Sequence, residues 1–337
     1  MKKKLLTGLI TVFISGLIIY LVTINVGKPR ILVLHSYYTD YSWVTDINKG
    51  ILRIIGGKPY SLRYFYMDTK RKPNNDYKIK IGQSARRMID KWKPDIIIAV
   101  DDDAQKHVAM HYNNDPSIKI IFTGMNATLK EYDYDKAKNA TGILERIPFQ
   151  EFREVFSAIL PVNKNRIVHI SDASTTSKFI HEELETVNWG RLKLVKSIQC
   201  ETFDEWKNAI DTAHKIGDII LFTHYHTIKD KDGSVINPKK IIEWTEPRLK
   251  IPDIGCWGFF VEDGGMMAVA VSPFEQGELA AKMAVKMLDY GMAPSSIPVL
   301  TSQQYIVYIR EKSVKKRNFV MPKILEAFAR ATNNYFE

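Results

Sequence analysis

The sequence lacks every short motif that would point directly to a reaction. Its 337 residues contain no Ser–His–Asp signature, no G-x-S-x-G nucleophile elbow and no GxxxxGK(S/T) phosphate loop. Its eight histidines are scattered, so no base can be paired with a nucleophile. Zinc-finger spacing and RNA-binding signatures are also missing, which argues against nucleic acid as a partner. We therefore expect a protein that is not an enzyme and that uses no cofactor and no metal.

The N-terminus carries an uncharged run that is long for a signal peptide. Three lysines precede Leu5–Val26, which holds 22 residues without a charge and no cysteine for lipid attachment. A signal-peptide core has about 7–15 apolar residues and a membrane-spanning helix needs about 20. No A-x-A cleavage site follows. The sequence predicts an uncleaved signal-anchor over residues 1–28, with a cleaved peptide as the alternative, and places residue 29 onward outside the cell membrane. Part of the net charge of +10 lies in this basic start, which favours a membrane surface over nucleic acid.

After this segment, apolar runs alternate with amphipathic stretches. Arg30–His35, Asp95–Val100 and Ile118–Phe122 are short apolar runs typical of buried parallel strands, and residues 76–92 between them have helical periodicity. The alternation restarts after Pro148 and continues to a helix over Glu275–Tyr290. Alternation of this kind predicts right-handed βαβ units in parallel sheets. Two such runs predict an α/β protein of two similar lobes, each a doubly wound parallel sheet with helices on both faces, preceded by the N-terminal hydrophobic helix.

The order of the expected strands decides the state of the two cysteines. The strand that ends at Cys200 should lie at the edge of its sheet, and the strand that leads to Cys256 should lie beyond two intervening strands. A disulfide needs Cα atoms within about 7 Å, whereas neighbouring strands are already about 4.8 Å apart. The sequence therefore predicts two buried free thiols.

Several longer stretches resemble a known family. They are ILVLHSYYTDYSWVTDINKGI (31–51), KPDIIIAVDDDAQKHV (93–108), IIFTGMNA (120–127), NATGILERIPFQEFREVFSAILP (139–161) and IPDIGCWGFFVEDGGMMAVAVSPFEQGELAAKMAVKML (251–288). In order and spacing they resemble ABC-transporter substrate-binding proteins of the type 1 periplasmic binding fold, in the branch of tryptophan- and tyrosine-type binding proteins. The resemblance covers nearly everything from residue 30 onward.

The resemblance implies an extracytoplasmic solute-binding protein of an ABC import system, whose cleft closes on a small ligand before docking on a permease. It implies three crossings between the lobes, with residues 29–147 and 272–300 in lobe 1 and residues 148–271 and 301–337 in lobe 2. A membrane-tethered receptor for a signalling partner is the first alternative, and an exported hydrolase the second. The ligands of the branch favour an amino acid or a similar zwitterion.

The ligand should contact residues beyond the carboxyl ends of the strands, where open α/β sheets bind their ligands. Asp101, Asp102 and Asp103 suggest a metal cluster, but adjacent carboxylates on one turn diverge, so we expect one helix cap and, at Asp102, a partner for a ligand ammonium. Ser174 and Thr175 begin a helix and suit an anionic group. The full set of expected ligand contacts is Ser36, Tyr37, Asp102, Asn126, Ser174, Thr175, Thr223, His224 and Trp257.

Each of these residues also has a plain structural explanation. Trp43 and one of the tyrosines near it can be core aromatics, and the glycines that follow Trp257 can simply make a turn between two strands. Asn126 can belong to an ordinary turn after a strand. His224 and His226 alternate as zinc ligands on a strand do, but no third ligand is evident, so a strand-end loop is the preferred interpretation. Four hydroxyl-bearing residues between Ser171 and Thr176 exceed what helix capping needs, which makes this segment the leading candidate for ligand contact.

Overall fold

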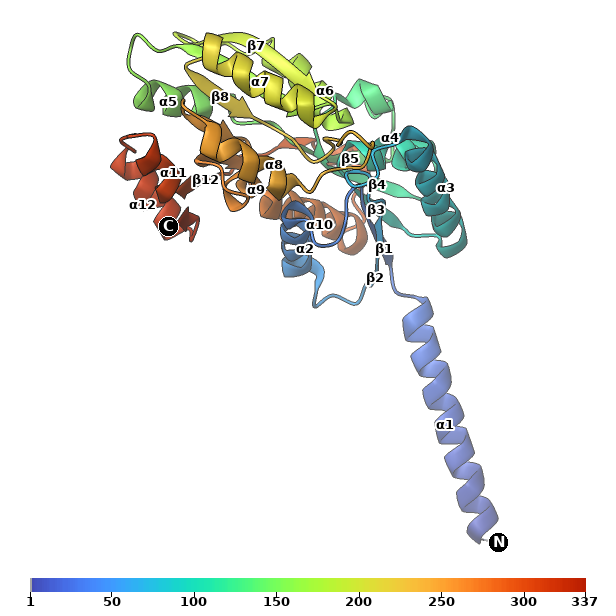
Figure 1. The fold of residues 1–337 in the computed structure, drawn as a ribbon. Coiled ribbons are helices and arrows are strands. Elements are labelled where there is room, and N and C mark those ends of the chain that lie inside the picture. The colour runs from blue at the N-terminus through green and yellow to red at the C-terminus, as the bar shows by residue number, and fades with distance from the viewer. Residues whose placement is uncertain (1) are drawn as a thin grey trace.

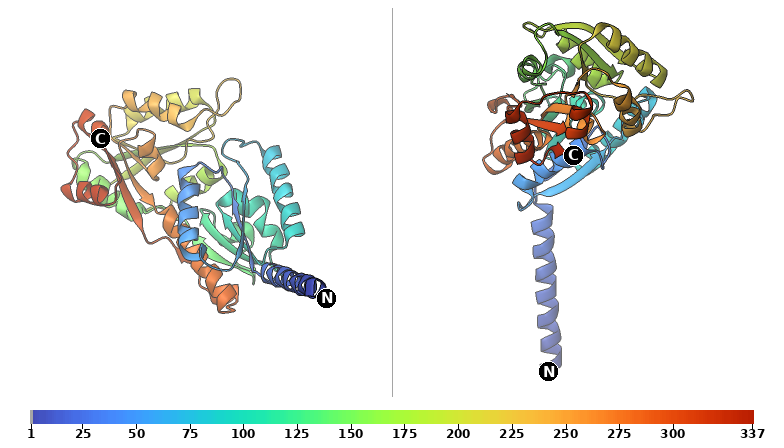
Figure 2. Two further views of the ribbon diagram at one scale, coloured as in Figure 1. Left: turned by 90° about the horizontal axis from the view of Figure 1, so that it is seen from below. Right: turned by 60° about the vertical axis from the view of Figure 1, so that its left-hand side comes forward.

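The computed structural model describes residues 2–337 and, within its first helix α1 (Lys2–Val26), the side chains of residues 6–20. α1 projects away from the rest of the molecule (Figures 1 and 2). Among the residues that the structure describes, no helix has both the length and the apolar character needed to cross a membrane. The anchor predicted over Leu5–Val26 is therefore not supported, and part of that stretch lies outside the described side chains.

The first sheet has six strands, and every neighbouring pair is parallel. Helices cover both faces, which explains why the central strands are continuous apolar runs. Along β1 (Arg30–His35), the first strand of the chain, Ile31 and Val33 enter one core, while Leu32 and Leu34 enter another. We call this sheet and its helices lobe 1. Its strands, in spatial order, are β11 (Leu300–Thr301), β5 (Ala140–Leu144), β4 (Lys119–Met125), β3 (Ile96–Val100), β1 (Arg30–His35) and β2 (Ser61–Tyr66), and its helices are α2 (Ser42–Ile55), α3 (Asn75–Trp92), α4 (Asp102–His107) and α10 (Pro273–Asp289).

The close packing of α2 against α10 explains two glycines within these helices. A Cβ on Gly50 would collide with the carbonyl oxygen of Phe274, and a Cβ on Gly277 would collide with that of Ile47. Glycine weakens a helix by about 0.5–1 kcal/mol relative to alanine. Here that cost allows the backbones of two helices that are far apart in sequence to touch, which joins the C-terminal half of the chain to lobe 1.

The second sheet has seven strands and, with its helices, forms lobe 2. Its strands, in spatial order, are β13 (Tyr335–Phe336), β12 (Tyr305–Arg310), β10 (Met267–Val271), β9 (Asp253–Gly255), β8 (Ile219–Phe222), β6 (Arg166–Asp172) and β7 (Lys193–Cys200). Its helices are α5 (Phe149–Ile159), α6 (Thr175–Leu184), α7 (Phe203–Ile216), α8 (Pro238–Thr245), α9 (Gly258–Glu262), α11 (Glu311–Lys316) and α12 (Lys323–Ala331).

Two strands at one edge depart from the expected all-parallel arrangement, because β12 runs antiparallel to β10 and β13 runs parallel to β12. The chain reaches β12 from β11 in lobe 1 through residues 302–304 alone. It therefore enters lobe 2 at the end of the sheet that faces lobe 1, where the parallel strands finish. A strand that begins at that end must run in the opposite direction.

The chain passes between the two sheets three times, after β5, after β10 and after β11. The carboxyl ends of the parallel strands in both lobes meet where these connections cross (Figure 1). The fold thus brings loops from both halves of the sequence to one interface.

Both cysteines are free and fully buried. β7 ends at Cys200 and is the edge strand, and β6 and β8 separate it from β9, which leads to Cys256. The strand order and the free thiols predicted from the sequence are confirmed.

We expect no reaction of the folded protein with a thiol reagent, because burial excludes the reagent and raises the pKa of both thiols. After unfolding without a reductant, two thiols per chain should titrate. A titre of zero in the unfolded protein would show that a disulfide forms despite the distance between the strands.

Candidate ligand-binding site

The interface between the lobes contains a buried group of polar residues. We call it the interlobe cluster, and its side chains come from the loops that follow the strands of both sheets. Charged groups are rarely buried without partners, because losing water costs several kcal/mol per ion. Their concentration between two lobes therefore requires an explanation. The cluster consists of Lys70, Asp101, Asn126 and Glu145 from lobe 1, and of Asp172, His224, His226 and Trp257 from lobe 2.

Glu145 links the two lobes within this cluster. Asn126 Nδ2 of lobe 1 donates a hydrogen bond to Glu145 Oε2 at 2.9 Å, and Trp257 Nε1 of lobe 2 donates one to Glu145 Oε1 at 2.8 Å. Burial raises the pKa of Glu145 to about 8, although both hydrogen bonds oppose the shift. The His224 ring stacks on Trp257 with their centroids 4.1 Å apart. Three residues expected from the sequence, Asn126, His224 and Trp257, therefore lie together.

Of the three consecutive aspartates 101–103, Asp101 is the one whose carboxylate faces the interlobe cluster. Its φ of 65° lies in the left-handed region, which is uncommon for a residue with a side chain. Trp43 Nε1 donates to Asp101 Oδ1 at 3.0 Å, and within the described part of the chain Oδ2 has no partner although it is buried. Burial and then the charge of Glu145 raise the pKa of Asp101, while Lys70 opposes this. A Cβ on Gly124 would lie 3.0 Å from Asp101 Oδ1, so glycine leaves room for the carboxylate.

Asp102, the carboxylate chosen from the sequence, lies within lobe 1 and has a full set of donors. The backbone N–H groups of Asn126 and Ala127 donate to it at 3.3 and 3.1 Å, and the Tyr132 hydroxyl donates at 3.1 Å. These contacts hold the loop after β4 against the start of α4. Burial still raises the pKa of Asp102 to about 6.

Two of the expected hydroxyls also make contacts inside one lobe. Ser36 Oγ donates to the carbonyl oxygen of Val100 at 2.7 Å and accepts from the backbone N–H of Ala104 at 2.8 Å. Thr223 Oγ1 lies 2.8 Å from His169 Nε2. Ser36 therefore joins β1 to β3 and α4, and Thr223 joins β8 to β6.

Ser174 and Thr175 lie at the rim of the interface, half-buried. Ser174 Oγ accepts from the backbone N–H of Ser177 and so caps α6. Thr175 Oγ1 donates to Asp103 Oδ1 of lobe 1 at 3.2 Å and accepts from Lys78 Nζ at 3.2 Å. Burial alone would raise the pKa of Asp103, but the charge of Lys78, 2.9 Å away, and hydrogen bonds from Lys78 and Thr69 together outweigh it and lower that pKa.

A second contact between the lobes lies beside this one. Tyr37, which follows β1 in lobe 1, places its hydroxyl 3.1 Å from Thr176 Oγ1 at the start of α6 in lobe 2. The lobes are thus in direct contact at α6, as expected for a closed arrangement of a two-lobed protein.

A cavity of about 260 Å³ opens at the same rim. It shares no residue with the interlobe cluster. Its lining is polar and comes from both lobes: Pro73, Asn75, Lys78, Lys106, His107, Ala173, Ser174, Thr175, Glu201, Thr227 and Lys229.

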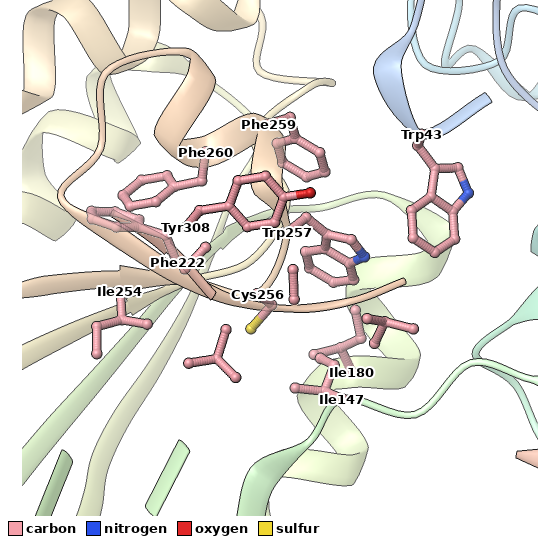
Figure 3. Packing of buried hydrophobic residues seen from close by; sticks show 14 of the residues in the cluster. Trp43, Ile147, Ile180, Phe222, Ile254, Cys256, Trp257, Phe259, Phe260 and Tyr308 are labelled. Atoms are coloured by element: carbon pink, nitrogen blue, oxygen red, sulfur yellow. The ribbon is translucent and has the colours of Figure 1, made fainter. Parts of the chain in front are cut away.

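The aromatic side chains of the site come from both lobes. Figure 3 shows Trp43 of lobe 1 beside Trp257 and Phe259 of lobe 2. Trp257 and Phe259 stack with centroids 5.8 Å apart, and Tyr41 of lobe 1 packs against Phe259 at 5.6 Å. A small cavity of about 20 Å³ separates Trp43 from Trp257. A cavity of this size has room for about one water molecule, so in this closed arrangement the aromatic rings pack mainly against one another.

Sequence reasoning missed five residues of the cluster, which are Lys70, Asp101, Glu145, Asp172 and His226. Lys70 begins the basic run Lys70-Arg71-Lys72, which is typical of a solvated surface, yet Lys70 is 2% exposed. It follows β2 just as Tyr37 follows β1, so its place after a strand was the signal that could have found it. Asp172 accepts from the Ser177 hydroxyl at 2.6 Å and from the backbone N–H of Thr227 at 3.0 Å, which positions the loop that carries His226.

The histidines of the site are held neutral. Burial, and then the charge of Lys70, lower the pKa of His224 and His226 well below the usual value. Each has a buried Nδ1 without a hydrogen-bond partner in the described structure. Over the same residues, no group of three His, Cys, Asp or Glu side chains is arranged to hold a metal ion. The arrangement can therefore bind a small solute through single donors and acceptors.

Comparisons with known proteins agree with this geometry. The family model described as ABC transporter substrate binding protein matches residues 61–332. A search of curated proteins found no significant match.

Solved structures share the fold at low sequence identity. A conserved domain protein from Vibrio cholerae O1 biovar El Tor is 16% identical, with a TM-score of 0.71, covering 92% of this chain and 100% of that one. An ABC domain in complex with L-Trp from Streptococcus pneumoniae is 16% identical, with a TM-score of 0.70 and coverages of 90% and 98%. A ligand-free, open substrate-binding protein from Clostridium difficile is 17% identical, with a TM-score of 0.58 and coverages of 87% and 96%.

Proposed function

The chain belongs to the family of ABC transporter substrate-binding proteins, and from this premise we propose that it is the solute-binding component of an ABC import system. Substrate-binding proteins of ABC systems are extracytoplasmic, and we propose the same location for the two lobes. The family and the fold are those of binding proteins rather than enzymes. The proposal therefore contains no catalytic step, and its partners are a small ligand and a membrane permease.

The observation that carries this proposal is the set of unpartnered polar atoms between the lobes. Lys70 Nζ, Asp101 Oδ2, Asn126 Oδ1 and the Nδ1 atoms of His224 and His226 are buried and have no hydrogen-bond partner in the described structure. Buried polar groups are nearly always hydrogen-bonded in native proteins. Five exceptions at one interface indicate that a solute supplies the missing partners.

We propose a zwitterion of the amino-acid class as the ligand. Asp101 Oδ2 and Asn126 Oδ1 are acceptors that suit an ammonium group, and the indole of Trp43 lies beside them. Trp257 and Phe259 offer flat faces to an apolar side chain. The similar structure from Streptococcus pneumoniae holds L-Trp, which supports a ligand of this class.

Binding would act through both lobes. A ligand drives closure only when it binds the closed state more tightly than the open one. The cluster meets this requirement, because Lys70, Asp101 and Asn126 belong to lobe 1 while His224, His226 and Trp257 belong to lobe 2. The rim contacts of Tyr37 and Thr175 would form as the cleft closes, and the closed form would then dock on the permease.

The lobe boundaries are part of the proposal. We assign residues 29–147 and 272–300 to lobe 1, and residues 148–271 and 301–337 to lobe 2. The strand order supports this division, because β11 pairs with β5 in the first sheet while β12 pairs with β10 in the second.

A thermal-shift screen of the purified full-length chain tests the proposed function. We expect at least one amino acid to raise the melting temperature, since a ligand at 100 times its Kd adds about 2.7 kcal/mol of stability. Nucleosides and neutral sugars serve as the comparison sets. A response to sugars alone would contradict the ligand class but keep the solute-binding role, and no response in any set would contradict the role.

A further inference from the structure

Lys70 occupies an unusual position for a lysine. It follows β2 in lobe 1, and its side chain is 2% exposed at the interface with lobe 2. Two contacts of the preceding residue fix the segment, because Thr69 donates from both its backbone N–H and its hydroxyl to the carbonyl oxygen of Ser36, each at 2.9 Å. Its neighbours Arg71 and Lys72 remain exposed at the surface. The backbone therefore turns one member of a basic run inward.

The ammonium group of Lys70 lacks the partners that a buried charge needs. In the part of the chain that the structure describes, Lys70 Nζ has no hydrogen-bond partner. It lies 4.4 Å from the centre of the Tyr37 ring and 5.5 Å from that of Tyr41. Aromatic faces attract a cation, but they do not replace the hydrogen bonds that its three N–H groups made in water. An unpaired buried ammonium destabilises a fold.

The charges that face Lys70 come from both lobes. Asp172 of lobe 2 and Asp101, Glu145 and Asp103 of lobe 1 all favour its charged form. Each of the four already has donors: Asp172 accepts from Ser177 and Thr227, Asp101 from Trp43, Glu145 from Asn126 and Trp257, and Asp103 from Lys78. They stabilise a positive charge at this place without binding it directly.

The remaining groups around Lys70 are neutral. Burial and the charge of Lys70 keep His224 and His226 unprotonated, and burial together with the nearby carboxylates raises the pKa of Tyr37 and Tyr41. Burial also lowers the pKa of Lys70 itself, and the carboxylates only partly offset this. An anion placed beside Lys70 Nζ would favour its protonated form.

We propose that Lys70 binds the anionic group of the ligand and selects for ligands that carry one. This inference rests on the proposed function and identifies the residue that binds the anionic end of the solute. The unpartnered Asp101 Oδ2 and Asn126 Oδ1 then accept hydrogen bonds from the cationic group at the opposite end of the ligand. Lys70 thereby takes the role that sequence reasoning gave to Ser174 and Thr175, whose hydroxyls cap α6 and contact lobe 1.

The test compares Lys70→Met and Lys70→Arg with the parent chain, and uses Lys72→Met as the matched control. Lys72 lies two residues away, and its side chain is 56% exposed. The probes are the twenty standard L-amino acids and the carboxamide of each, which lacks the negative charge. Binding is measured by thermal shift and then by calorimetry for the responding pair.

We expect the parent chain to prefer the acid over its carboxamide by about 10- to 100-fold, as one charge-assisted hydrogen bond provides. Lys70→Met should lose this preference, and the loss is scored on the ratio of acid to carboxamide affinity rather than on the melting temperature without ligand. Lys70→Arg should retain the preference, and Lys72→Met should behave as the parent does.

Proton uptake gives a second readout. Calorimetry in two buffers of different ionisation enthalpy should show that the parent takes up more protons per bound acid than Lys70→Arg does, since the anion favours the protonated form of Lys70. Lys70→Arg should take up fewer protons, because arginine stays charged in proteins. A purely structural lysine would not produce this difference.

Three outcomes would overturn the inference, and they are distinguishable. If Lys70→Met binds amino acids and still prefers the acid, the inference fails while the proposed function stands. If Lys70→Met melts well below the parent without ligand, and Lys70→Arg restores stability but not the acid preference, Lys70 has a structural role. If the parent responds to no amino acid, the inference falls together with the proposed ligand class.

Discussion

Replacing Asp101 with asparagine is expected to weaken the binding of an ammonium-bearing ligand by about 10- to 150-fold. A hydrogen bond to a charged group contributes about 1.5–3 kcal/mol, and the buried Asp101 Oδ2 has no partner in the described structure. Asparagine tolerates the left-handed backbone found at this position, and its oxygen can still accept from Trp43. Calorimetry with the amino acid found by screening measures the loss.

The neighbouring carboxylate provides the control for this experiment. Asp102→Asn should destabilise the fold by about 1–3 kcal/mol, because an amide group would face donors that now bind a carboxylate. Its effect on affinity should be small. If Asp102→Asn removes binding without lowering stability and Asp101→Asn is silent, the assignment of these two residues is reversed.

Glu145 should make the stability of the unliganded protein fall as the pH rises. Its pKa is about 8 in the folded chain, against about 4.5 for an ordinary glutamate. The folded state therefore holds a proton that the unfolded state releases. The stabilisation is complete below about pH 4.5, declines as the pH rises through about 8, and amounts to on the order of 4 kcal/mol.

Glu145→Gln should flatten this part of the pH profile. Glutamine stays neutral, and it can keep the bond from Trp257 while Asn126 rotates its amide to accept from the new N–H group. Urea unfolding at pH values between 5 and 8.5 measures the change in the free energy of unfolding. A residual slope is expected, because the pKa values of Asp101, Glu262 and Asp263 are also raised.

Glu185→Gln is the matched control, since this side chain is 68% exposed. It should leave the profile unchanged. If the profile of Glu145→Gln fell with pH as steeply as that of the parent, this would contradict the buried, protonated state of Glu145.

Much of the architecture could be predicted from the sequence, for a simple reason. Strands buried on both faces must be apolar along their whole length, and a helix on a sheet must be amphipathic, so both patterns are visible locally. The run Arg30–His35 and the periodicity over residues 76–92 correspond to β1 and α3. The chain order of strands and the right-handed rule for βαβ units then placed Cys200 and Cys256 three strand steps apart.

The direction of β12 could not be predicted from the sequence in the same way. Its residues alternate as those of any strand can, and composition does not record the end at which a strand begins. Only the position of β11 in lobe 1, three residues before β12, shows that the chain enters the second sheet from the interface.

The identity of the site residues depended on three-dimensional structure for a further reason. Asp101 and Asp102 are adjacent and chemically identical, but a φ of 65° at Asp101 turns its carboxylate toward Trp43, while Asp102 turns toward the loop after β4. Lys70 begins a basic run whose next two residues, Arg71 and Lys72, are exposed. Local sequence specifies which residues end a strand, because hydrophobic periodicity is local. Which of those residues meet is decided when lobes built from distant segments close on one another, because burial is a property of the whole fold.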